Sequence, residues 1–81
     1  MPKSLFSKDY AVFLEVLIES RKKAGLTQEQ LAERLGTTQS VISKCERGER
    51  RLDIVELRRW CSAVGIGLLN FIVDFEERLT E

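Results

Sequence analysis

Glycine residues divide this chain into short segments of helical periodicity, and this punctuation restricts the fold more than any other feature. Gly25, Gly36, Gly48 and Gly65 each follow such a segment, and a glycine in that place closes a helix in the left-handed conformation. The chain has no strand-like alternation of useful length and no Asn-Gly hairpin turn. We therefore predict an all-α fold. The five predicted helices span residues 8–24, 27–35, 38–46, 53–64 and 67–79.

Capping residues stand where several of these helices are predicted to begin. Thr27 and Gln30 have the spacing of a capping box, in which each side chain bonds to the backbone N–H of the other residue. Asp53 and Glu56 repeat that spacing before the fourth predicted helix. Because the loops are short, consecutive helices must pack against one another. The candidates for the other two N-caps are Ser7 or Asp9, and Thr37 or Thr38.

The size and composition of the chain suit one small globular domain, and we predict that residues 1–81 form a single unit. Hydrophobic residues make up 43% of the chain, and 13 basic residues balance 13 acidic ones, which argues against disorder. The chain has no histidine, the commonest general base and metal ligand. Cys45 and Cys61 form no CxxC pair. We therefore expect no enzymatic activity, no cofactor and no metal site.

Nothing in the sequence predicts a membrane protein. No apolar segment reaches the ~20 residues that span a bilayer. Residues 1–4 lack the layout of a signal peptide. We therefore expect a cytoplasmic protein that does not associate with a membrane.

Basic residues concentrate in the middle of the chain, although the net charge is zero. Residues 21–59 contain ten basic and six acidic residues, whereas residues 1–20 and 60–81 each carry a net negative charge. This asymmetry is compatible with a middle segment that binds a polyanion, and equally with an ordinary mixed surface.

The third predicted helix, which follows a tight turn at Gly36, has two contrasting sides. Val41, Ile42 and Cys45 fall on one side at 100° per residue, and so are predicted to face the core. The opposite side is polar and has no acidic residue. Its members are Ser40, Ser43, Lys44 and Arg47, with Gln39 at its edge. Such a helix suits the major groove of DNA, because glutamine can bond adenine and lysine or arginine can bond guanine, with no carboxylate to repel phosphate.

This segment resembles the Cro/cI-repressor type of helix-turn-helix found in phage repressors. The resemblance covers roughly residues 14–69, and its motifs are LTQEQLAERLG at 26–36, QSVISK at 39–44 and ERGER at 46–50. It implies a compact five-helix, lambda-repressor-like domain whose helix-turn-helix spans residues 27–46. It also implies a transcriptional regulator that binds double-stranded DNA in a sequence-specific manner through residues 38–46.

The resemblance assigns DNA contacts to individual residues. Gln28, at the start of the second helix, and the turn after the third helix are implied to contact phosphates. Base contacts are implied for Gln39, Ser40 and Lys44. Arg51 is either a phosphate contact or a partner of Asp53. The predicted DNA-binding residues are Gln28, Thr38, Gln39, Ser40, Ser43, Lys44, Arg47 and Arg50. Without the resemblance, Lys44 and Arg47 would be interpreted as ordinary solvated residues.

A buried ion pair between Arg21 and Glu46 is also implied by the resemblance. Arg21 shares a helical stripe with Leu14, Leu17 and Ala24, which agrees with an inward direction. The chain departs from the family pattern at three positions that we interpret as core substitutions: Cys45, Trp60 and Cys61.

The last predicted helix carries more apolar residues than one helical face can hide. Leu68, Ile72, Phe75 and Leu79 form one stripe. The apolar residues outside that stripe are Leu69, Phe71 and Val73. The helix therefore packs back across the first helix, forms a dimer interface, or does both.

The favoured function is that of a homodimeric repressor or autoregulator that reads a palindromic operator, because one recognition helix reads too few base pairs for useful affinity. The alternative is a protein-interaction module, such as an antitoxin, that binds a partner protein through the apolar C-terminal helix, residues 67–79.

Overall fold

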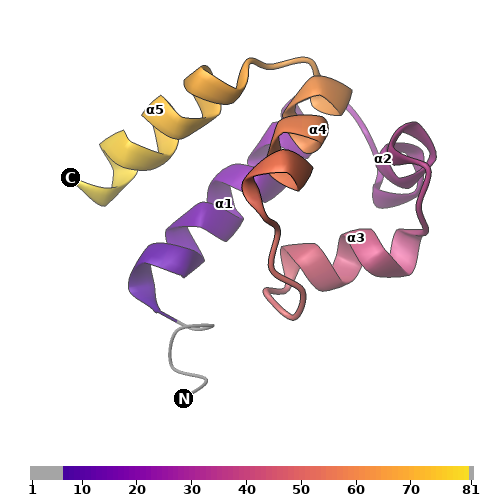
Figure 1. The fold of residues 1–81 in the computed structure, drawn as a ribbon, viewed down its shortest axis with the longest axis horizontal. Helices are drawn as coiled ribbons and strands as arrows, with labels where there is room; N and C mark the ends of the chain where they lie inside the picture. Colours follow the sequence, from indigo (N-terminus) through magenta and orange to yellow (C-terminus); the bar gives the residue numbers. More distant parts are fainter. Residues whose placement is uncertain (1–6, 81) are drawn as a thin grey trace.

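The computed structural model describes residues 7–80, which form five helices and no strand. The all-α prediction is confirmed. Every helix end lies within one residue of its predicted position. Four of the predicted starts are one residue early, because they fall on the N-cap residues. No helix in this part of the chain combines the length and apolarity needed to cross a bilayer. The helices are α1 (Lys8–Lys23), α2 (Gln28–Leu35), α3 (Gln39–Glu46), α4 (Ile54–Val64) and α5 (Leu68–Leu79) (Figure 1).

Both predicted capping boxes are present. The N–H of Gln30 donates to Thr27 Oγ1 at 3.1 Å, and the N–H of Thr27 donates to Gln30 Oε1 at 2.9 Å. The same reciprocal bonds join Asp53 and Glu56, at 2.8 and 2.9 Å. These bonds satisfy backbone donors that a helix start otherwise leaves unpaired. Of the alternatives for α1 and α3, the structure has Ser7 and Thr38 as the N-caps.

The turn between α2 and α3 depends on Gly36. Its φ of +68° lies in the left-handed region, which glycine adopts at little cost. The next N–H, from Thr37, donates to the carbonyl of Ala32 at 2.9 Å and so ends α2. The other glycines predicted to close helical segments also have positive φ: Gly25, Gly48 and Gly65.

The hydrophobic core is built around large side chains of α4 and α5. Trp60 and Phe71 are each 1% exposed. The indole N–H of Trp60 donates to Ser20 Oγ at 3.2 Å, so the polar atom of the ring is satisfied inside the core. Cys45 and Cys61 are buried as free thiols. The predicted core positions of Trp60 and both cysteines are therefore confirmed.

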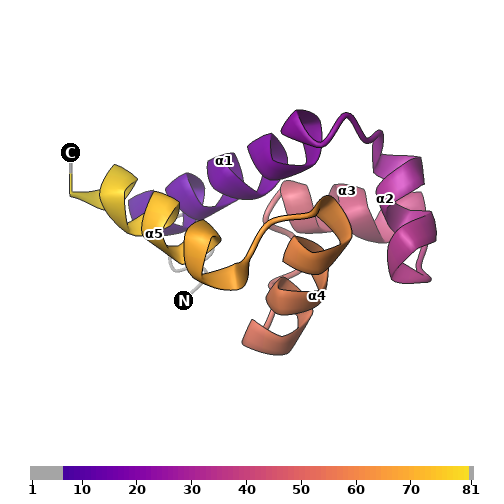
Figure 2. The same cartoon turned by 90° about the horizontal axis from the view of Figure 1, so that it is seen from above.

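α5 packs across α1 within the same chain, at the end of the molecule away from α3 (Figure 1, Figure 2). The ring of Phe13 on α1 meets those of Phe71 and Phe75 edge-on, with centroids 5.7 and 5.9 Å away. The buried face of α5 is centred on Phe71 and not on the predicted stripe. One residue turns a helix by 100°, so the position of α1 decides which face is covered. The apolar residues left exposed on α5 are Leu69, Ile72 and Val73.

Candidate DNA-binding surface

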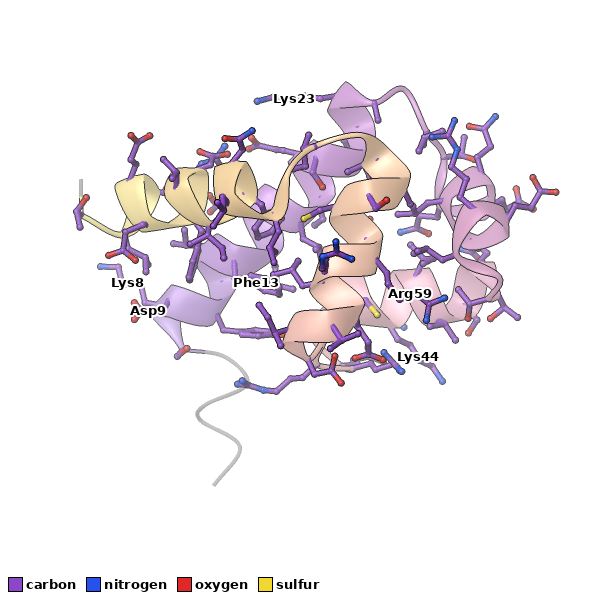
Figure 3. The ribbon with its side chains drawn as sticks, turned by 45° about the horizontal axis from the view of Figure 1, so that its top comes forward. Lys8, Asp9, Phe13, Lys23, Lys44 and Arg59 are labelled. Carbon is purple, nitrogen blue, oxygen red and sulfur yellow. The ribbon has the colours of Figure 1, made fainter. Side chains whose placement is uncertain are left out.

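α3 packs on α2 with one side and presents the other to solvent. Leu31 and Ala32 of α2 and Ile42 and Cys45 of α3 are buried in the same core cluster. The predicted inward and outward sides of α3 are confirmed. Figure 3 shows Lys44 at the edge of the molecule that α3 forms. On this outer side, Ser43 is half-buried, and the exposed side chains are those of Gln39, Ser40, Lys44 and Arg47.

A chain of polar contacts runs from the core to the start of α3. Arg21 and Glu46 form the ion pair that the family resemblance implied, with Nε 2.6 Å from Oε2 and NH2 3.1 Å from Oε1. Gln28 Nε2 donates to Glu46 Oε1 at 2.8 Å. Gln39 Nε2 donates in turn to Gln28 Oε1 at 2.6 Å. The exposed Gln39 is therefore connected to a buried ion pair through one intervening side chain.

Gln28 has a different environment from that of a freely exposed phosphate contact. Its side chain is half-buried, and its amide bonds to both Glu46 and Gln39. The cap at Thr27 binds the backbone N–H of Gln30. The backbone N–H groups of Gln28 and Glu29 come before it at the start of α2. The first N–H groups of a helix have no partner inside it, and they point toward an anion at its start.

Arg47, the C-cap residue of α3, is held by two neighbours. Its Nε and NH2 atoms lie 2.8 and 3.2 Å from the two carboxylate oxygens of Glu49. Its NH1 donates to Ser43 Oγ. The hydrogen bond to Arg47 lowers the pKa of Glu49, and the same bond raises the pKa of Arg47. Both side chains are about half exposed, so this pair can be exchanged for other partners at little cost.

Arg50 is tied to both α3 and α4. Its NH2 lies 2.8 Å from Glu56 Oε2, and its NH1 lies 3.9 Å from Cys45 Sγ. The pKa of Glu56 is lowered first by the backbone N–H of Asp53, which it accepts in the capping box, and then by Arg50. Burial raises the pKa of the Cys45 thiol. Arg50 therefore fixes the turn after α3 as well as adding positive charge to it.

The sequence did not predict that Glu49 and Glu56 belong to this surface, although each pairs with one of its arginines. Glu49 follows Arg47 by two positions, and Glu56 follows Arg50 by six. Neither spacing is one of the i, i+3 or i, i+4 spacings by which partners on a helix are identified. The turn after α3 brings each pair together.

Thr38 has a local partner, whereas Arg51 contacts a residue far away in the sequence. Thr38 caps α3 through the N–H of Val41. The guanidinium of Arg51, for which Asp53 was a candidate partner, lies 4.2 Å from the ring centroid of Tyr10. No group of three or more metal-ligating side chains occurs within residues 7–80.

Comparison with known proteins identifies the family. The sequence model of the family described as Helix-turn-helix matches residues 17–70. An uncharacterized HTH-type transcriptional regulator of Sinorhizobium fredii is 32% identical over 57 residues, which cover 70% of this chain and 74% of the relative. A second uncharacterized HTH-type transcriptional regulator, from Methanothermobacter thermautotrophicus, is 43% identical over 47 residues, which cover 58% of this chain and 68% of the relative.

A solved structure has the same fold. An XRE-family like protein from Pseudomonas syringae pv. tomato superposes with a TM-score of 0.83 and 38% identity, covering 94% of this chain and 93% of that one. The lambda-repressor-like fold is therefore confirmed. The family is one of DNA-binding regulators and not of enzymes. The chain belongs to the helix-turn-helix family, in its Cro/cI-repressor or XRE type.

Proposed function

We propose that this DNA-binding regulator of transcription places α3 in the major groove and reads base edges with Gln39, Ser40 and Lys44. The observation that supports this most is the polar chain that leads from the buried Glu46 through Gln28 to Gln39. A side chain discriminates between bases best when its conformation is held before binding. Gln39 is exposed and yet held in this way.

The bond to Gln28 leaves Gln39 able to read adenine. A side-chain amide has two N–H donors and one carbonyl oxygen. One donor of Gln39 is bonded to Gln28. The second donor and the oxygen are the pair that adenine N7 and its N6 amino group require. Lys44, one helical turn after Ser40 on the outer side of α3, can donate to guanine.

Phosphate contacts are proposed at the start of α2 and in the turn after α3. The start of α2 offers the backbone N–H groups of Gln28 and Glu29. The turn after α3 offers Arg50 and also Arg47, whose carboxylate partner Glu49 is exchangeable. Thr38 and Ser43 lie beside the base-reading residues.

We also propose that the protein acts as a homodimer, with residues 1–81 as one domain, and represses or autoregulates at a palindromic operator. The exposed stripe of Leu69, Ile72 and Val73 on α5 supports this assembly, because α5 already satisfies its other face against α1. A two-fold dimer would place two copies of α3 in successive major grooves, about 34 Å apart.

Selection from randomised duplex DNA tests this function. The expected result is a palindromic site with half-sites about 10 base pairs apart, centre to centre. The Gln39→Ala variant should lose its preference at one position of each half-site while keeping the others. Enrichment of no sequence, or identical sites for wild type and variant, would count against the assignment.

A protein-interaction role is the second candidate, since the same α5 stripe could seat a partner protein. Sedimentation of the purified chain separates the two. A homodimer at micromolar concentration supports the proposal that α5 joins two copies of this chain. A monomer, together with a second polypeptide that co-purifies in fixed ratio and is released by Leu69→Glu, would support the antitoxin-like alternative.

A further inference from the structure

We propose that Glu49 acts as an internal substitute for DNA phosphate, which occupies Arg47 in the free protein and thereby lowers the affinity for DNA of any sequence. This inference rests on the proposed function, because it requires the outer side of α3 to face DNA. The carboxylate of Glu49 meets the guanidinium through two contacts, at 2.8 and 3.2 Å. Phosphate oxygens bind a guanidinium with the same forked geometry. Glu49 and a DNA phosphate therefore compete for the same donors.

The pair is positioned where DNA would meet it. Arg47 is the C-cap residue of α3, and its NH1 group bonds Ser43 on the outer side of that helix. Glu49 lies two residues further on, and its backbone N–H donates to the carbonyl of Lys44 at 2.9 Å. The carboxylate is thus tied to the same turn that carries Lys44 and Arg47.

Glu49 can release Arg47 without disturbing the fold. Both side chains are about half exposed, at 53% and 55%, and exposed ion pairs are weak. The neighbouring pair of Arg50 and Glu56 differs in this respect, because Glu56 also completes the capping box of α4. The effect of Glu49 on DNA binding can therefore be measured separately from any effect on the stability of the fold.

The effect on DNA recognition follows from the origin of non-specific affinity. That affinity comes almost entirely from the neutralisation of phosphates, whereas base selection comes from contacts in the groove. A carboxylate that occupies one arginine weakens binding to every sequence and leaves Gln39 and Lys44 unchanged. Glu49 thus limits the time that the protein spends on non-operator DNA.

A double-mutant cycle tests the inference. Binding of Glu49→Gln, Arg47→Ala and the double variant to random-sequence duplex is measured over a range of salt concentrations. Glu49→Gln should bind about 3- to 10-fold more tightly near 0.1 M salt, with a salt slope steeper by about 0.9, as for one added phosphate contact. In the Arg47→Ala background the same change should raise affinity less than about twofold, because the competing partner is absent.

Glu33→Gln is the matched control, because it removes the same charge from a residue that lines one surface pocket with Thr37 and Gln39, near the start of α3. It should give a smaller gain than Glu49→Gln, and one that does not depend on Arg47. Equal gains from Glu49→Gln in both backgrounds, or no gain in either, would overturn the inference. The proposed function would still stand if Lys44→Ala weakens binding to the selected operator. If Arg47→Ala and Lys44→Ala both leave the affinity for that operator unchanged, the assignment of α3 to the DNA face is wrong as well.

Discussion

The Nε atom of Arg21 lies 2.6 Å from Oε2 of Glu46, and the two buried side chains connect α1 to the end of α3 across 25 residues of sequence. The NH1 group of Arg21 also donates to the carbonyl of Leu26 at 2.8 Å. This pair sets the position of α3, because Glu46 is its last residue and also bonds Gln28.

Removal of Glu46 should therefore destabilise the protein far more than removal of the exposed Glu49. Glu46→Ala leaves Arg21 charged and buried without its partner, which costs about 3–5 kcal/mol. In a domain of this size each kcal/mol corresponds to roughly 4–8 °C in Tm. Glu49→Ala is expected to keep a Tm close to that of the wild type. Thermal unfolding followed by circular dichroism measures both, and equal Tm values for the two variants would contradict the role of the buried pair.

Lys44→Ala should weaken binding to the selected operator by about 1–3 kcal/mol if Lys44 reads a base. Binding to random duplex should then change much less. A loss of similar size on every sequence would instead assign Lys44 to phosphate. Arg58→Ala, which removes the same charge from the exposed surface of α4, serves as the control, and Kd values by fluorescence anisotropy at fixed salt provide the comparison.

Substitutions of Phe71 and Leu69 on α5 distinguish a core side chain from a proposed interface side chain. Phe71→Ala opens a cavity in the core and should lower the free energy of unfolding by about 3–5 kcal/mol. Leu69 is 76% exposed, so Leu69→Ala should leave the unfolding of dilute protein nearly unchanged. It should, however, raise the dissociation constant of the dimer in sedimentation equilibrium. Unaltered dimerisation of Leu69→Ala would show that this stripe is not the interface.

Acid should loosen the contact between α5 and α1. Arg78 donates to both carboxylate oxygens of Glu19, at 2.6 and 3.1 Å, and this bonding lowers the pKa of Glu19. The folded state therefore takes up its proton at a lower pH than the unfolded chain, whose glutamate pKa is about 4.3. The stabilisation is present above that value and is lost as the pH falls through the folded pKa.

Urea unfolding of wild type and Glu19→Gln, compared at about pH 6 and about pH 3.5, tests this linkage on either side of the ordinary glutamate pKa. The variant should lose less stability on acidification than the wild type. The side chain of Glu19 is about half exposed, so the difference is small, on the order of 1 kcal/mol or less. An equally steep loss in both proteins would show that the pair with Arg78 contributes nothing to folding.

The two thiols should resist modification in the folded protein. Cys61 is 1% exposed, and burial raises its pKa to about 11. The reactive thiolate is therefore scarce near neutral pH. Reaction with Ellman's reagent should be slow in native buffer and fast in urea. Rapid reaction of the native protein would contradict the interpretation of Cys45 and Cys61 as core side chains.

Local features of the sequence were enough to predict the helices and their ends. A capping box such as that of Thr27 and Gln30, or a glycine such as Gly36, acts on backbone groups only a few residues away. The two sides of α3 were also predictable, because helical geometry alone places Ile42 and Lys44 on different sides. The ion pair of Arg21 and Glu46 came from the family resemblance, since 25 residues separate its members.

The tertiary structure decided what depends on how distant segments meet. It placed Phe71 and not Ile72 at the centre of the buried face of α5, because that choice depends on where α1 crosses it. It joined Gln39 to Gln28 across a helix-helix contact, and it brought Glu56 of α4 to Arg50 in the turn after α3. Short-range rules apply within about one helical turn of the chain, whereas these contacts arise only when whole helices have settled against one another.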